Sequence, residues 1–170
     1  MTYQIPAEEY HEFYETYVRH VNGHDPLIKL AEGETRLTDW YSGKTDEQLL
    51  YRYAEGKWTP KEVLGHIIDA ERLFAYRAFR ISRGDQTPLA GFDQDPYIPA
   101  GRFNERSFTH LMEEYEAVRL STRKMIEAIH SDQLPLIGTA NGVEISLRAQ
   151  LAIIAGHELH HLQILEERYQ

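Results

Sequence analysis

The chain has 170 residues, the size of one ordinary domain, and 42% of them are apolar and 26% charged, which is typical of a globular protein with a single sizeable core. Its 27 acidic and 18 basic residues give a formal charge of −9, which argues against the phosphate backbone of a nucleic acid as the main partner. The sequence contains no cysteine, which excludes a disulfide framework, a thiolate metal ligand and a cysteine nucleophile, so His, Asp or Glu must hold any bound metal.

Apolar residues that recur with helical period begin near the N-terminus. The first such segment spans about residues 6–21, where an aromatic and aliphatic stripe runs from Tyr10 to Val21. A less regular stretch follows over about 26–41, and we expect a short turn of helix after Thr45. No repeat, linker or low-complexity block interrupts the chain, so the sequence predicts a single domain.

The next predicted helix has the clearest start in the sequence. Thr59 is a capping residue, Pro60 occupies the first helical position, and Glu62 can complete a capping box. Helical period continues to about Arg83, where Gly84 can end the helix.

A long loop follows over residues 85–103. It holds three prolines, and loops of that length inside compact domains are often functional. Its aromatic residues Phe92, Tyr97 and Phe103 could cover a pocket or pack locally.

Another helix is predicted over about 105–130, with Asn104 as its capping residue. The connection after it, residues 131–145, contains the pair Asn141-Gly142, which is typical of a tight turn.

The final predicted helix starts near Ser146 and runs almost to the end of the chain. Its centre, residues 151–156, is apolar on every side, as in a helix that is buried on several sides. Long helices with little strand signal predict an all-α fold, and four principal helices make a four-helix bundle over residues 1–170.

The expected location is cytoplasmic. No apolar run approaches the roughly 18–20 residues that cross a bilayer, and residues 1–9 are polar and acidic, unlike a signal peptide. Neither a membrane nor a nucleic acid is therefore an expected partner.

The chain has nine histidines, and most of them lie among charged residues or near the ends of predicted helices. Isolated polar side chains in such places are ordinarily solvated or act as caps, and this is the interpretation for His11, His20, His24, His110 and His130. His66 differs because it falls within an apolar stripe. Taken alone, such a residue is more often a hydrogen-bonded core histidine than a metal ligand.

His157 and His161 are four residues apart, so on a helix their imidazoles lie on one face about one turn apart. That spacing suits two ligands of one transition-metal ion. Since they directly follow an apolar stretch, their polar atoms need either a metal or hydrogen bonds to tyrosines and carboxylates of neighbouring helices. Both interpretations stay open at this point.

The same stretch reads His-Glu-x-x-His, the helical signature of zinc proteases, in which Glu158 would be the general base. Such enzymes usually take their third ligand from downstream, but the residues after His161 all fall on the same predicted helix, and the expected preceding strand is missing. The protease interpretation is therefore disfavoured.

An upstream third ligand fits a bundle better, because neighbouring helices could bring His66 beside His157 and His161. Three histidines leave a coordination position open, as in catalytic sites. Asp69 projects from nearly the same face as His66 and could orient an imidazole or hold a water, although a surface carboxylate is an equal alternative. The neighbouring charged residues Glu71, Arg72, Arg77 and Arg80 are expected to be salt-bridged or solvated rather than catalytic.

Two segments resemble the DinB-like superfamily of four-helix-bundle proteins, which is named for damage-inducible bacterial members. They are Trp-x-x-x-x-x-x-Gly-His at 58–66, within the longer segment 56–71, and Gly-His-Glu-Leu-His-His-Leu at 156–162. The resemblance implies that His66, His157 and His161 bind a divalent metal, commonly zinc or nickel, and that the protein is a homodimer.

Members of that superfamily with known activity are similar to bacillithiol S-transferases and mycothiol-dependent isomerases, and many others are described as metal-dependent hydrolases. The resemblance therefore implies a small-molecule substrate and either transfer of a low-molecular-weight thiol or hydrolysis, with Asp69 or Glu158 as base in the hydrolase. The alternative is a non-enzymatic, metal-stabilised bundle that binds a ligand or serves a stress response.

Overall fold

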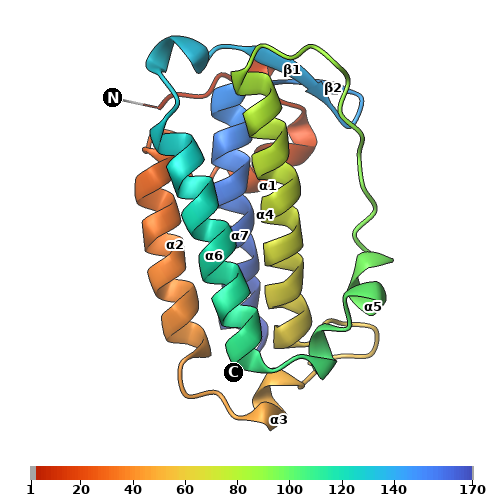
Figure 1. Cartoon of the computed structure of the whole chain (residues 1–170). Helices are drawn as coiled ribbons and strands as arrows, with labels where there is room; N and C mark the ends of the chain where they lie inside the picture. The colour runs from red at the N-terminus through yellow and green to blue at the C-terminus, as the bar shows by residue number, and fades with distance from the viewer. Residues whose placement is uncertain (1–2, 170) are drawn as a thin grey trace.

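The computed structural model describes residues 3–169, and within that range four long helices pack side by side as a bundle (Figure 1). They are α2 (Pro26–Tyr41), α4 (Pro60–Ser82), α6 (Phe108–Glu127) and α7 (Leu147–Arg168). Helix α7 packs against both α2 and α4, and α6 also packs against α4. The predicted all-α, four-helix-bundle class is confirmed.

Shorter elements connect and cap the bundle. They are α1 (Glu15–Val18), α3 (Asp46–Leu49), α5 (Tyr97–Gly101), the antiparallel strands β1 (Ile137–Ala140) and β2 (Val143–Ser146), and 3-10 turns at Ala7–Glu9, Glu12–Tyr14, Phe103–Glu105 and Ser131–Gln133. The hairpin lies at one end of the bundle and α3 at the other (Figure 1). No helix in residues 3–169 combines the length and apolar character that a membrane span requires.

Side-chain caps fix where α4 and α7 begin. The Thr59 hydroxyl accepts a hydrogen bond of 3.1 Å from the backbone N–H of Glu62, whose carboxylate accepts one of 2.8 Å from the backbone N–H of Thr59. The Ser146 hydroxyl accepts one of 3.1 Å from the N–H of Ala149. Gly84, with φ of +73°, ends α4. Each cap contributes about 1 kcal/mol and confirms the predicted start of its helix.

The predicted helix over residues 6–21 is wrong. The backbone of Tyr10 and His11 is extended, with ψ of 158° and 142°, so two 3-10 turns precede the single turn of α1. The His11 side chain accepts a hydrogen bond from the N–H of Phe13 and caps the second turn. Stripe residues such as Val18 are nevertheless buried. The bundle is completed instead by α2, which forms from the less regular stretch over residues 26–41.

The predicted cap at Asn104 is also wrong, because α6 begins three residues later, after Ser107. The Asn104 side chain accepts a hydrogen bond of 2.6 Å from the Thr59 hydroxyl and donates one of 2.9 Å to the Glu62 carboxylate. Asn104 therefore ties the end of the long loop to the start of α4. In the sequence, a short polar side chain near the start of a helix is equally compatible with capping that helix and with bonding to another one.

The segment over residues 85–103 runs along the outside of α4 from the hairpin to α5 (Figure 1). Backbone hydrogen bonds attach it to the hairpin: the N–H of Leu89 donates to Thr139 O at 2.8 Å, and the N–H of Asn141 donates to Leu89 O at 3.0 Å. Asn141 and Gly142 have φ of +55° and +77°, which confirms the predicted tight turn. This end of the segment is therefore fixed in place.

The apolar core forms two clusters along α4 and α7. One includes the N-terminal segment, Phe74 and Ile153, and the other includes Leu64, Leu111 and Leu162. His66, His157 and His161 lie on α4 and α7 where these two clusters meet.

Candidate metal centre

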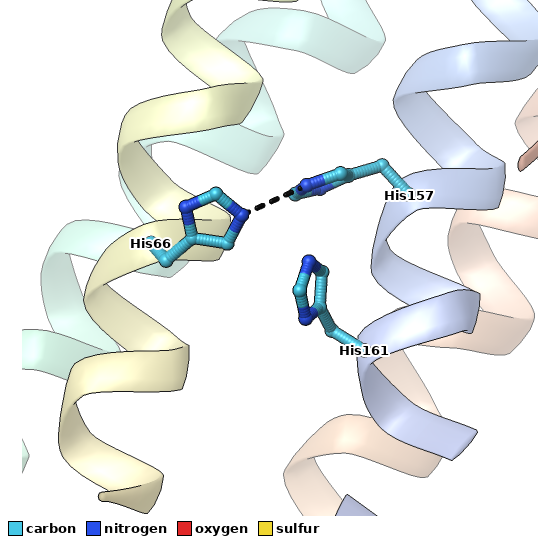
Figure 2. Close-up of side chains that lie close together, drawn as sticks. All are labelled: His66, His157 and His161. Atoms are coloured by element: carbon cyan, nitrogen blue, oxygen red, sulfur yellow. Dashed lines mark hydrogen bonds between the residues drawn. The ribbon is translucent and has the colours of Figure 1, made fainter. Parts of the chain in front are cut away.

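Three histidine rings converge between α4 and α7 (Figure 2). His66 extends from α4, and His157 and His161 extend from α7 one turn apart. The Nε2 atoms of His66 and His157 are 3.0 Å apart, and one ring nitrogen of each histidine lies within 4.8 Å of the other two. The structure thus brings together the three histidines that the sequence predicted as ligands.

The cluster is enclosed by the bundle. His66 and His157 are only 3% and 4% exposed, and His161 keeps a partly exposed edge. Burial lowers the pKa of His66 to about 4. Burial, with the neighbouring histidines as a smaller cause, lowers the pKa of His157 and His161 well below their ordinary value. All three imidazoles are therefore neutral at pH 7, the state in which imidazole binds metals.

The donor set fits a divalent transition-metal ion. Zinc–nitrogen distances of about 2.0–2.1 Å in a tetrahedral site place the nitrogens about 3.3–3.4 Å apart, and the separations in this cluster, from 3.0 Å to at most 4.8 Å, bracket that value. Among residues 3–169, no ring nitrogen of the three histidines has a hydrogen-bond partner outside the cluster. Hydrogen bonds to tyrosines and carboxylates, the alternative left open by the sequence, therefore do not satisfy these rings.

Aromatic side chains form the walls of the cluster. The ring centroid of Trp58 lies 4.9 Å from that of His66, and those of Tyr17 and Phe74 lie 5.2 and 5.3 Å from that of His157. Their faces and edges pack against the imidazoles of His66 and His157. In the sequence, Tyr17 and Phe74 are ordinary members of apolar stripes and carry no signal of their own, whereas Trp58 belongs to the family motif.

Gly156 makes the wall at Tyr17 possible. A Cβ atom at Gly156 would lie 2.0 Å from the backbone oxygen of Tyr17, so any other residue would push α1 away from α7. A glycine inside an apolar helix is the signal in the sequence that another backbone approaches closely.

Glu158 takes part in a buried charge network on another side of α7. Its carboxylate accepts hydrogen bonds from Arg119, at 3.0 and 2.5 Å, and from the Tyr115 hydroxyl at 2.7 Å. Arg119 also donates to Glu71, at 2.7 Å, and to Leu30 O at 3.1 Å. These contacts hold Glu158 between α6 and α2. Among the described residues, no hydrogen bond joins the Glu158 carboxylate to a histidine of the cluster. Its catalytic role stays a prediction.

Asp69 lies near charged residues of α4 and α6. Its carboxylate is 3.6 Å from the Arg72 guanidinium, which also donates to Glu114 at 2.7 Å. Burial raises the pKa of Asp69, and the charge of Arg72 opposes this effect. No hydrogen bond joins Asp69 to a histidine of the cluster in the described part of the chain, so its catalytic role also stays a prediction.

The remaining histidines largely follow expectation. His11 caps a 3-10 turn, and the others that are exposed are His24, His110 and His130. His20 differs, because its Nε2 atom is buried and has no hydrogen-bond partner among residues 3–169. The solvated interpretation of His20 is therefore wrong.

A pocket of about 220 Å³ opens beside His157. Its aromatic walls include Tyr17, Phe74 and Phe92, and its charged and amide side chains are Arg77, Asp93, Gln94 and Asn141. Phe92 of the long loop thus covers a pocket, whereas Phe103 of the same loop packs in the core at 3% exposure. The pocket gives a small molecule access to one side of the cluster.

Arg77 departs from its predicted behaviour. Glu71, Arg72 and Arg80 form ion pairs as expected, but no carboxylate in the described chain lies within 4.0 Å of the Arg77 guanidinium, although this residue is only 4% exposed. Sequence reasoning could have noticed that Arg77 shares the buried stripe of Phe74 and Ile81.

Comparisons with known proteins agree with this architecture. Residues 29–165 match the family described as the DinB superfamily. The "Putative metal-dependent hydrolase OB0413" of Oceanobacillus iheyensis is 27% identical over 142 residues, which cover 82% of this chain and 80% of that protein. A solved structure, "YfiT from Bacillus subtilis is a probable metal-dependent hydrolase with an unusual four-helix bundle topology", is similar with a TM-score of 0.74 and 18% identity, over 96% of this chain and 90% of that one.

Proposed function

The chain belongs to the DinB superfamily, and we propose that it is a metal-dependent hydrolase of a small molecule, with His66, His157 and His161 as the metal ligands. The observation that carries the proposal is the convergence of three neutral imidazoles within 4.8 Å of one another beside a pocket. The two similar proteins, whose names describe metal-dependent hydrolases, support the same reaction class.

The ligand set favours a catalytic centre over a purely structural one. Structural zinc sites are closed by four protein ligands, whereas three histidines leave a position open. When bound, a divalent ion such as Zn²⁺ or Ni²⁺ supplies a positive charge that polarises a substrate carbonyl and acidifies water. The pocket beside His157 leads a substrate to this position.

We propose a positioning role for Glu158 rather than the role of general base. Its carboxylate is already engaged by Arg119 and Tyr115, so it has little freedom to accept a further proton from a substrate water. Because Glu158 follows His157 directly, these bonds fix the rotation of α7 and hence the direction of the His157 ring. Asp69 remains the candidate base, although Arg72 is its observed partner.

Thiol transfer is the second candidate. The chain has no cysteine, so a low-molecular-weight thiol would have to come from outside and occupy the open position of the ion. A bundle that binds metal but turns over neither water nor thiol would instead be a non-enzymatic ligand-binding protein.

Elemental analysis of the purified protein tests the site first. We expect about one divalent transition-metal ion per chain in the wild type, a loss of metal in His66→Ala and His161→Ala, and unchanged metal in His24→Ala, an exposed histidine that serves as matched control. Equal and negligible metal in all four proteins would refute the proposed ligands.

The reaction class needs a separate assay. We expect the metal-loaded wild type to hydrolyse 4-nitrophenyl acetate faster than His66→Ala, with no dependence on added thiol. A rate with 1-chloro-2,4-dinitrobenzene that requires a small thiol and is lost in His66→Ala would favour thiol transfer instead.

A further inference from the structure

The guanidinium of Arg77 forms part of the wall of the pocket beside His157. It lies 5.8 and 5.9 Å from the ring centroids of Phe74 and Phe92, and its Nη2 donates a hydrogen bond of 2.8 Å to the backbone oxygen of Ala90. The side chain is thus fixed in place by one hydrogen bond and two rings.

The charge of Arg77 is not neutralised by any contact. An arginine has five N–H donors, and the bond to Ala90 O occupies one of them. No Asp or Glu oxygen in residues 3–169 lies within 4.0 Å of the group. By contrast, the other deeply buried arginine, Arg119, pairs with Glu71 and Glu158. Burying an unpaired cation is costly, so such a group in a pocket wall points to an anionic ligand.

Asp93 is the carboxylate that could have served as the partner of Arg77, since it lines the same pocket. It is exposed, and its Oδ1 accepts a hydrogen bond of 3.1 Å from the N–H of Asp95. The other polar side chains that line the pocket carry no negative charge at pH 7: they are Tyr14, Tyr17, Gln94, Asn141 and His157. The positive charge of Arg77 is therefore available to a ligand.

The pocket is built before any ligand arrives. Ala90 and Phe92 belong to the segment that the backbone bonds of Leu89 attach to the hairpin, so both sides of the Arg77 cradle are held by regular structure. A preformed cradle does not have to be ordered on binding, which favours affinity for a small ligand.

We infer that this pocket binds a small molecule that carries a carboxylate, with Arg77 as its recognition group and Phe74 and Phe92 packing against its apolar part. A single guanidinium matches one carboxylate in charge and in its forked geometry. A dianion such as a phosphate monoester would exceed that charge and face Asp93 at the rim. The inference rests on the proposed function, since the bound molecule would place its reacting bond beside His157.

Isothermal titration calorimetry with three simple probes tests this specificity. They are benzoate, its neutral isostere benzamide, and phenyl phosphate, each titrated into protein kept metal-free by a chelator and into zinc-loaded protein. We expect benzoate to bind about tenfold or more tighter than benzamide, which corresponds to one charge-assisted interaction. The preference for benzoate should persist in the metal-free protein, because Arg77 provides it. A carboxylate that binds only to the ion would show no such preference once the metal is removed.

Two variants assign the preference to Arg77. Arg77→Met should reduce the benzoate preference to about one, and Asp93→Asn, the matched change of the other charge in the pocket, should leave it equal or larger. If Arg77→Met does not fold, Arg77→Lys keeps the charge and a donor for Ala90 but lacks the fork, and benzoate should bind severalfold more weakly.

Equal affinity for benzoate and benzamide in the wild type, tighter binding of phenyl phosphate, or a preference that survives in Arg77→Met would overturn the inference. Where Arg77→Met does not fold, benzoate binding in Arg77→Lys as tight as in the wild type would overturn it. A benzoate preference in a protein that contains no metal as purified and binds no added zinc would remove the proposed hydrolase and leave the carboxylate site standing. Metal binding with no benzoate preference would remove the carboxylate site and leave the proposed metal centre standing.

Discussion

Replacing Arg119 with methionine tests the buried charge network next to the histidine cluster. Arg119 is 0% exposed and makes hydrogen bonds to both carboxylates of the network, Glu71 and Glu158. Methionine has a similar length but no charge. The variant would leave two buried carboxyl groups without a cation, and one of them would keep only the hydroxyl of Tyr115 as a donor.

The structure sets the size of the expected effect. Holding one glutamate neutral at pH 7, when its ordinary pKa is 4.5, costs about 3 kcal/mol. Two independent groups would double that cost, but losing one partner of a buried ion pair is usually worth about 3–5 kcal/mol. We therefore expect Arg119→Met to lower the free energy of unfolding by about 3–5 kcal/mol at pH 7.

Acid should relieve this loss. Burial raises the pKa of Glu158, and without Arg119 nothing opposes this effect except the hydroxyl of Tyr115, so the folded variant binds more protons than the unfolded chain and its relative stability rises as the pH falls. At pH 5 the destabilisation should shrink to roughly 1–2 kcal/mol.

Urea unfolding in a chelating buffer at pH 7 and pH 5 measures both values. The control is Arg119→Met combined with Glu71→Gln and Glu158→Gln, which removes all three charges and should recover much of the loss. A loss below about 1 kcal/mol at pH 7, or one that is the same at both pH values, would refute the account of the network.

Three further predictions concern the cluster and its walls. Gly156→Ala should lower the free energy of unfolding by about 1–3 kcal/mol and weaken metal binding, because its Cβ would lie 2.0 Å from Tyr17 O and this overlap outweighs the helix preference of alanine; a higher melting temperature would contradict it. Burial lowers the pKa of His66 from 6.5 to about 4, so below pH 6.5 the unfolded chain binds a proton that the folded protein does not. The free energy of unfolding of the metal-free protein should therefore be highest above pH 6.5 and fall by up to about 3 kcal/mol as the pH falls from 6.5 to 4. Urea unfolding across that range should show a smaller loss in His66→Asn, and an identical pH dependence in both proteins would count against it. Zinc at a hundred times its dissociation constant should add about 2.7 kcal/mol to the stability of the wild type, and a similar gain in His161→Ala would show that the ion binds elsewhere.

Local sequence signals were sufficient for the helices that carry the site. Thr59 and Ser146 indicate where α4 and α7 begin. A capping residue bonds to backbone groups within one turn, so its effect can be predicted from the local sequence. Once the two helices are neighbours, the positions of His66, His157 and His161 follow from helical phase. The convergence of these three residues could therefore be predicted without knowledge of the loops.

Longer-range packing decided what the sequence did not predict. The spacing of Tyr14 and Val18 reports a buried face, but burial against α7 does not require a continuous helix, and the extended backbone at His11 interrupts it. The partner of Glu158 depended on which arginine of α6 turns inward. Arg119 shares a stripe with Tyr115 and Thr122, so helical phase contained a signal that charge alone obscured.

The wall on the side of Tyr17 is built from short elements, one helical turn and two 3-10 turns. It can separate from α7 without breaking any of the four long helices. Openings of such short segments have lower free energies than global unfolding and expose little surface. We therefore expect a bound ion to escape to a chelator through this side, at a rate nearly independent of mild urea, so that loading and release are governed by the N-terminal segment.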